Sequence, residues 1–119
     1  MLKQNYFSPA ELTCKCGCGL NNFSALTLAK LNVARETAGI PFVITSACRC
    51  PAHNAKVGGK PSSAHLRGHA VDIRTQTSSH RYIIVAALLA AGFNRIGLAD
   101  TFIHVDDDPS LPERVIFNY

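Results

Sequence analysis

Residues 63–73 read SAHLRGHAVDI and residues 102–106 read FIHVD, and these two stretches decide the fold. Apolar residues alternate with other residues in both, a period that predicts strands. Each predicted strand carries one polar side chain in an apolar frame, Asp72 in the first and His104 in the second. A buried carboxylate without a partner is costly, so Asp72 is expected to have one.

Two imidazoles and one carboxylate supply that partnership. His65 precedes Asp72 from a predicted loop, and His104 follows in the second strand. A lone histidine in a strand usually bonds a backbone carbonyl, but this trio matches the nitrogen and oxygen ligands of catalytic zinc, which leave a fourth position open. A rival pair, His65 and His69, has the spacing of a His-Glu-x-x-His helix but lacks the glutamate and contains Gly68.

Outward from these stretches, helices and strands interleave along the chain. Ser and Pro residues at helix starts and Gly residues at helix ends set the helix boundaries. The last three strands follow one another with short connections, which favours a small antiparallel sheet with helices packed on it, an α+β fold. Helices are predicted at 6–12, 24–38, 51–57 and 78–91, the last capped by Ser78 or Ser79, and strands at 40–45, 69–73, 93–97, 101–105 and 114–117.

Size and charge restrict the class of protein. The 119 residues predict a single domain, 1–119, without linker or repeat. The net charge is +4, but Lys and Arg are scattered and no nucleic-acid motif accompanies them, so nucleic acid is not the expected partner. The longest apolar run, at 83–91, is too short to span a bilayer. We expect a monomer.

The five cysteines have two interpretations. Cys14, Cys16 and Cys18 lie in one stretch, and Cys48 and Cys50 flank an arginine. A second, structural metal would take the thiolates of Cys14, Cys16 and Cys18 from the first stretch and that of Cys50 from the second. Structural zinc sites favour two to four residues between paired cysteines, and here only one intervenes, which argues for disulfides or reduced thiols instead. On either interpretation the two stretches are expected to meet.

Several motifs in order resemble the zinc D-alanyl-D-alanine carboxypeptidase family, in particular its short bacterial and phage cell-wall peptidases. They are Ser-x-His-x-x-Gly-x-Ala-x-Asp-Ile at 63–73, SACRCPxHN at 46–54, Gly-Gly at 58–59 and FIHVD at 102–106. The resemblance covers residues 6–119. It implies the fold shared by hedgehog domains and DD-peptidases, with zinc in a cleft on one face of the sheet. It also implies that His65, Asp72 and His104 are the zinc ligands.

The resemblance further implies roles around the metal. Arg49 is expected to bind substrate and stabilise developing negative charge, although Ala47 and Cys48 replace the usual glycine and tyrosine before it. Ser63 is expected to orient the site by hydrogen bonding. The family places its general base about three residues before the last ligand, where this chain has Thr101, so Asp100 is the predicted base. Asp106 is the alternative base, or a partner that orients an imidazole.

The expected protein is therefore a zinc-dependent peptidase that hydrolyses peptidoglycan stem peptides next to a D-amino acid, as a D,D- or L,D-carboxypeptidase or endopeptidase. The alternative is a catalytically weak, metal-bearing binding or structural module. The first residues lack the apolar stretch of a signal peptide, so synthesis in the cytoplasm is expected, with delivery to the cell wall by other means.

Overall fold

A mixed five-stranded sheet forms the centre of the molecule in the computed structural model, which describes residues 4–119. The strands lie in the order β1-β2-β4-β3-β5, and all neighbours are antiparallel except β3 and β5, which are parallel. The predicted α+β class is confirmed, and only the last strand departs from an antiparallel sheet. The strands are β1 (Val43–Ser46), β2 (Ala70–Arg74), β3 (Arg95–Leu98), β4 (Phe102–Asp106) and β5 (Val115–Asn118).

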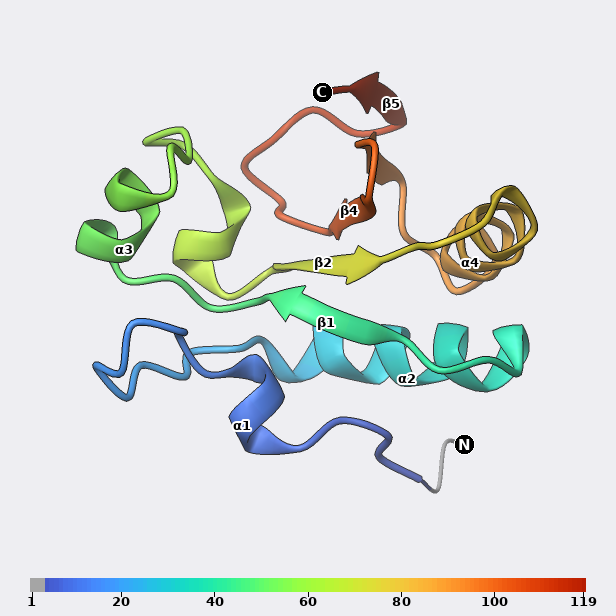
Figure 1. The fold of residues 1–119 in the computed structure, drawn as a ribbon, viewed down its shortest axis with the longest axis horizontal. Coiled ribbons are helices and arrows are strands. Elements are labelled where there is room, and N and C mark those ends of the chain that lie inside the picture. The colour runs from blue at the N-terminus through green and yellow to red at the C-terminus, as the bar shows by residue number, and fades with distance from the viewer. Residues whose placement is uncertain (1–3) are drawn as a thin grey trace.

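Within the part of the chain that the structure describes, five helical segments accompany the sheet: α1 (Pro9–Leu12), α2 (Ala25–Ala38), α3 (Pro51–Lys56), the 3-10 helix η1 (Ala64–Arg67) and α4 (Ser78–Ala90). In Figure 1, α2 runs beneath β1, α4 stands at one end of β2, and α3 lies at the opposite end. None of the helices in residues 4–119 has both the length and the apolar character needed to cross a membrane.

The helix ends follow the capping residues in the sequence. Ser24 accepts a hydrogen bond from the Thr27 amide at the start of α2, and Gly39 ends that helix at a φ of 70°. The start of α4 differs from the prediction, because the capping side chain is Thr77, which accepts from the His80 amide, rather than Ser78 or Ser79. The segment that forms η1 was expected to be loop; Ser63 caps it by accepting from the His65 amide at 3.2 Å.

Side-chain alternation gives the sheet two different faces. One face carries the core residues of the central strands, which pack against α2 and α4; its buried members include Ile44, Val71, Ile73, Ile96, Ile103 and Val105. Each fully buried side chain of this size contributes about 1.5–3 kcal/mol. The opposite face of the same strands carries Asp72, His104 and Asp106, so the core residues fix the positions of these polar side chains.

Candidate metal centre

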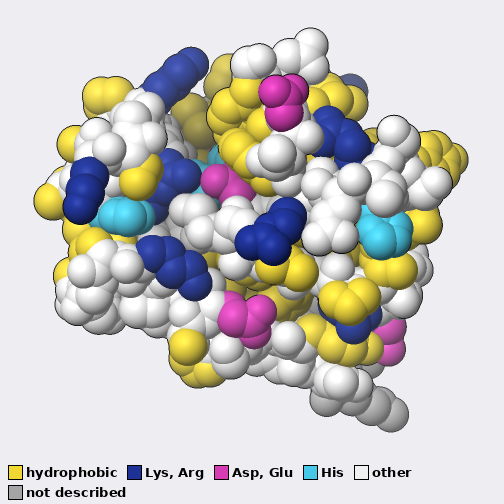
Figure 2. All heavy atoms as spheres, in the orientation of Figure 1, with side chains coloured by type: hydrophobic (Ala, Val, Ile, Leu, Met, Phe, Trp, Pro, Cys, Tyr) yellow, Lys and Arg dark blue, Asp and Glu magenta, His cyan; other side chains and the backbone are white. Residues whose placement is uncertain are grey.

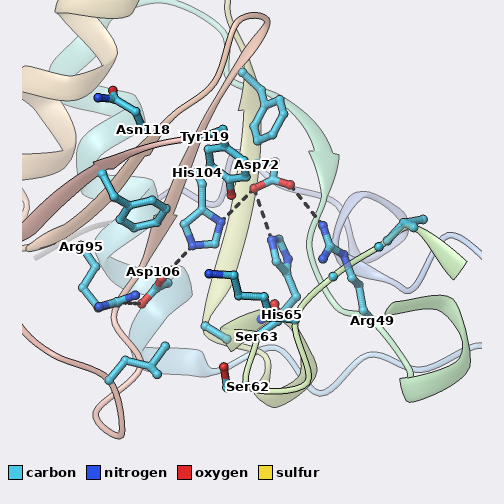
Figure 3. Close-up of a pocket in the computed structure, with 18 residues that line it drawn as sticks. Arg49, Ser62, Ser63, His65, Asp72, Arg95, His104, Asp106, Asn118 and Tyr119 are labelled. Carbon is cyan, nitrogen blue, oxygen red and sulfur yellow. Dashed lines mark hydrogen bonds and ion pairs between the residues drawn. The ribbon is translucent and has the colours of Figure 1, made fainter. Parts of the chain in front are cut away.

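His65, Asp72 and His104 come together on the polar face of the sheet. Asp72 on β2 and His104 on β4 are directly paired across the two strands, and η1 brings His65 over them. One donor atom from each residue lies within 4.8 Å of the other two. The Asp72 Oδ1 atom is 3.2 Å from His65 Nε2 and 3.0 Å from His104 Nδ1. Both rings point at this carboxylate in Figure 3.

The donor chemistry of the three residues fits a cation. His65 donates from Nδ1 to the Ala47 carbonyl oxygen at 2.7 Å, because that oxygen can only accept, so a neutral ring has its lone pair on Nε2. His104 Nε2 lies 2.7 Å from Asp106 Oδ2, and donation to this oxygen leaves the lone pair of a neutral ring on Nδ1. Two nitrogen lone pairs and one carboxylate oxygen then converge, and zinc accepts this ligand set.

A chain of charged side chains supports the last ligand. Asp106 is 1% exposed and accepts from Arg95 Nε at 2.8 Å through its other oxygen, Oδ1. A carboxylate on the remaining nitrogen of a metal-binding imidazole fixes the orientation of the ring. Asp106 therefore orients His104. This is the second of the two roles expected for it, the first being that of general base. Arg95 was missed by sequence reasoning, although a lone arginine beside Ile96 in a predicted strand is a usable signal.

Arg49 reaches the same carboxylate from the other side. Its Nη2 donates to Asp72 Oδ2 at 3.3 Å, its Nε to Ser46 Oγ at 3.0 Å, and its Nη1 to Asn54 Oδ1 at 3.1 Å. Asn54 in turn donates to the Lys60 carbonyl oxygen at 2.9 Å, so α3 supports the guanidinium. Arg49 is therefore directed at the metal centre even though Ala47 and Cys48 stand where the family has glycine and tyrosine (Figure 3).

The charges of the centre are set by competition between burial and hydrogen bonding. Burial opposes ionisation of Asp72, but hydrogen bonds from His104 and His65 outweigh it and hold its pKa well below the usual range. Burial also opposes protonation of His104, yet Asp106 and Asp72 raise the pKa of this imidazole. The pKa of Asp106 is lowered by His104 and Arg95 against the effect of burial. Metal binding to His104 therefore competes with protonation of this imidazole.

The three residues lie in a cleft of about 750 Å³ that is open to solvent. Its residues come from the loop after α3, from η1, from the polar face of the sheet and from the C-terminal strand. They are Arg49, Val57, Gly58, Gly59, Lys60, Ser62, Ser63, Ala64, His65, Asp72, Arg95, Phe102, His104, Asp106, Leu111, Phe117, Asn118 and Tyr119. The space-filling view shows a hollow on this face, with the Lys and Arg side chains spread around it rather than gathered in one patch (Figure 2).

Aromatic side chains from the end of the chain form one wall of the cleft. The ring centroids of Phe117 and Tyr119 lie 5.9 and 6.5 Å from that of His104. Gly97 permits this approach, since a Cβ atom there would lie 2.6 Å from Phe117 and 2.8 Å from Tyr119. Burial and the charge of Asp72 raise the pKa of Tyr119 to about 12, so its hydroxyl stays protonated.

The other predicted residues have different positions. Ser63 lines the cleft and orients the backbone of His65 through its hydroxyl. Asp100 lies in the exposed turn between β3 and β4 and is not among the cleft residues, so its role as a base stays a prediction. His69, the second member of the rival histidine pair, is not among the cleft residues and lies 3.2 Å from Asp107 Oδ1 and Thr27 Oγ1, beside α2.

Comparison with known proteins agrees with this geometry. No curated protein matches the chain. A family model described as Peptidase M15 matches residues 5–106, a segment that includes all three donor residues, Arg49 and Asp106. The chain therefore belongs to the Peptidase M15 family, the zinc metallopeptidases of the D-alanyl-D-alanine carboxypeptidase type.

Proposed function

We propose that the protein is a zinc-dependent peptidase that hydrolyses peptidoglycan stem peptides next to a D-amino acid. The observation that carries the proposal is the convergence of His65 Nε2, Asp72 Oδ1 and His104 Nδ1 at one point of an open cleft. Three protein ligands in an accessible cleft are typical of catalytic rather than structural zinc. Membership of the Peptidase M15 family supports the same reaction class.

The surrounding residues are arranged to keep this ligand set in place. The Ala47 carbonyl oxygen fixes the tautomer of His65, and Asp106 does the same for His104. Zinc bound here would supply a Lewis acid that polarises the scissile carbonyl and lowers the pKa of water. Asp72 contributes a charged oxygen and remains bonded to Arg49 through its second oxygen.

Arg49 gives the cleft a preference for anionic peptides. A guanidinium has five N–H donors, and the structure shows three of them used by Ser46, Asn54 and Asp72, which leaves two for a ligand. A substrate carboxylate bound to these donors would lie beside the three ligand residues. Stem peptides offer such carboxylates at their ends and side chains. The preference for a neighbouring D-amino acid is supported by the family resemblance alone.

Proton transfer needs a carboxylate, and two are proposed. Asp106 lines the cleft, but its two oxygens are bonded to His104 and Arg95, which suits it to positioning. Asp100 is exposed in the turn before β4, four residues before His104, and does not line the cleft. Asp100 serves as proton acceptor only if the turn at 99–101 brings it to the cleft.

A second candidate function follows from the carboxylates of the cleft. The carboxylates that line the cleft in residues 4–119 are Asp72 and Asp106, and both are held by histidine and arginine side chains. This favours a metal-bearing module that binds wall peptides without cleaving them. The two functions differ in whether a peptide bond is broken.

A product map separates them. Purified muropeptides are incubated with the zinc-loaded protein, with and without chelator, and the products are identified by mass spectrometry. The peptidase predicts chelator-sensitive cleavage at one bond type next to a D-residue, and synthetic peptides with the L-residue there stay intact. Muropeptides that bind but are not cleaved would establish the module; cleavage of both stereoisomers would contradict the proposed substrate.

A further inference from the structure

Four thiols meet outside the cleft, and the proposed peptidase reaction does not use them. Cys14, Cys16 and Cys18 come from the loop after α1, and Cys50 from the residue that caps α3. Their sulfur atoms all lie within 4.8 Å of one another, with Cys16 Sγ 3.5 Å from Cys14 Sγ and 3.6 Å from Cys50 Sγ. Cys16 and Cys50, which are 34 positions apart in the sequence, are therefore neighbours in the structure.

The sulfur separations match a tetrahedral metal site. A disulfide joins sulfurs at about 2.05 Å, and all five cysteines are free here. A tetrahedral zinc ion with Zn–S distances of about 2.3 Å places its sulfurs about 3.8 Å apart. The separations from Cys16 Sγ to Cys14 Sγ and Cys50 Sγ, 3.5 and 3.6 Å, lie close to this value, and every other pair lies within 4.8 Å.

Backbone conformation explains how cysteines separated by a single residue converge. Gly17, between Cys16 and Cys18, has a φ of 89°, a left-handed conformation that turns the chain sharply. The sequence argued against a metal because structural zinc sites favour two to four residues between paired cysteines. In the structure the sulfurs converge although only one residue separates Cys14 from Cys16 and Cys16 from Cys18. Cys14 is further held by a hydrogen bond from its amide to the Leu20 carbonyl oxygen at 2.8 Å.

Amide donors point at the sulfurs and favour the thiolate forms that bind metals. The Cys50 amide donates to Cys14 Sγ at 3.4 Å, the His53 amide to Cys50 Sγ at 3.4 Å, and the Leu20 amide to Cys18 Sγ at 3.5 Å.

We propose that Cys14, Cys16, Cys18 and Cys50 bind a second zinc ion with a structural role. Four protein ligands close the coordination sphere, which distinguishes this site from the three-ligand centre in the cleft. The ion would fix the loop after α1 to the start of α3. Arg49 lies between Cys50 and Cys48, whose amide donates to the Leu12 carbonyl oxygen at 3.1 Å. The proposed site thus holds the segment that directs Arg49 into the cleft.

The test measures zinc in a chain that lacks the imidazole ligands. The full-length His65→Ala/His104→Ala variant is purified with zinc under reducing conditions, and its metal content is determined by mass spectrometry. We expect one zinc per chain, and we expect it to be lost when Cys16→Ser or Cys18→Ser is added. These two residues are chosen because their side chains are exposed and can change without disturbing the core. Cys48→Ala is the matched control: Cys48 is buried against Asn21, outside the cluster, and the zinc should remain.

A spectroscopic measurement keeps the test independent of those variants. Cobalt(II) added to the metal-free wild-type protein should produce strong thiolate-to-cobalt charge-transfer absorption, and Cys16→Ser should weaken it. Three results would each overturn the second site. They are absence of this absorption, absence of zinc in the folded His65→Ala/His104→Ala variant, and an unchanged zinc content when Cys16→Ser is added to that variant. None of these results depends on peptidase activity, so failure of this site and failure of the proposed function are distinguishable.

Discussion

Asp72 is the residue on which the proposed centre depends, since His65, His104 and Arg49 all bond to its carboxylate. Removing one member of such a buried set leaves charges without partners. Asp106 has a different role, because it accepts a hydrogen bond from His104 and is itself held by Arg95. Substitutions of Asp106, Arg49 and Asp100, which are not ligands, separate metal binding from catalysis.

Asp106→Asn should weaken zinc binding at the cleft without removing a ligand. The asparagine side chain is uncharged and accepts the hydrogen bond from His104 Nε2 less strongly than a carboxylate does. Loss of such a carboxylate partner lowers metal affinity about 10–100-fold. Competition with a chromogenic chelator measures the change, in a Cys16→Ser background that removes the second site. Asp100→Asn, a carboxylate outside the cleft, is the control and should keep the original affinity. Equal affinities in all three proteins would contradict the positioning role.

Arg49→Lys should raise KM for carboxylate-bearing peptides while zinc content stays at its original value. Lysine keeps the charge but loses the planar set of donors that now contacts Ser46, Asn54 and Asp72. A hydrogen bond to a charged group contributes about 1.5–3 kcal/mol, so kcat/KM should fall about 10–150-fold. Steady-state kinetics on one stem peptide checks this, and an unchanged kcat/KM would remove Arg49 from substrate binding.

The role of Asp100 is decided by turnover at full zinc occupancy. If it accepts the proton, Asp100→Ala retains zinc and lowers kcat by 100-fold or more, the usual contribution of general-base catalysis. Zinc retention follows from its position in the exposed turn, outside the cleft. Turnover equal to that of the unsubstituted protein would exclude Asp100 as the acceptor.

At the scale of the elements, β4 joins the core to the metal centre. Ile103 points into the core and His104, its neighbour, points into the cleft. Ile103→Ala should therefore lower the free energy of unfolding by about 2–5 kcal/mol through the cavity it creates. Urea denaturation measures this cost. Ile116→Ala on β5, where the side chain is 60% exposed, is the control and should cost about 0.5 kcal/mol or less.

The sequence was sufficient for elements that carry their own signals. Apolar alternation around Asp72 and His104 located β2 and β4, and Ser24 and Gly39 bounded α2. Features that depend on contacts between distant segments were missed or predicted wrongly. The parallel pairing of β5 with β3 depends on the path of the chain after β4, and Arg95 acquires its role only by facing Asp106.

The same limit applied to the thiol cluster. Spacing alone gave no account of the φ of 89° at Gly17 or of the amides that face the sulfurs from α3. The ligand trio was easier to predict, because each of its members lies in a motif of the family. Arg49 was predicted to act in the cleft, but its support by Asn54 and Ser46 required the structure.

In the molecule as a whole, the apolar side chains and the polar side chains of the metal centre lie on opposite faces of one sheet. The core face packs on α2 and α4, and the other face opens into the cleft beneath the aromatic wall of Phe117 and Tyr119. Two proposed zinc ions would then have separate tasks, one at the reaction centre and one at the loop that carries Arg49. Metal removal should accordingly affect both activity and stability.

Whether the three ligands form a catalytic zinc site is measured by hydrolysis of a stem peptide as zinc is added back to the metal-free protein. We expect the metal-free protein to be inactive, activity to return with zinc bound at His65, Asp72 and His104, and His104→Ala to stay inactive at every zinc concentration. Full occupancy of these three ligands without cleavage of any stem-peptide bond, or equal cleavage by the metal-free protein, would contradict this expectation.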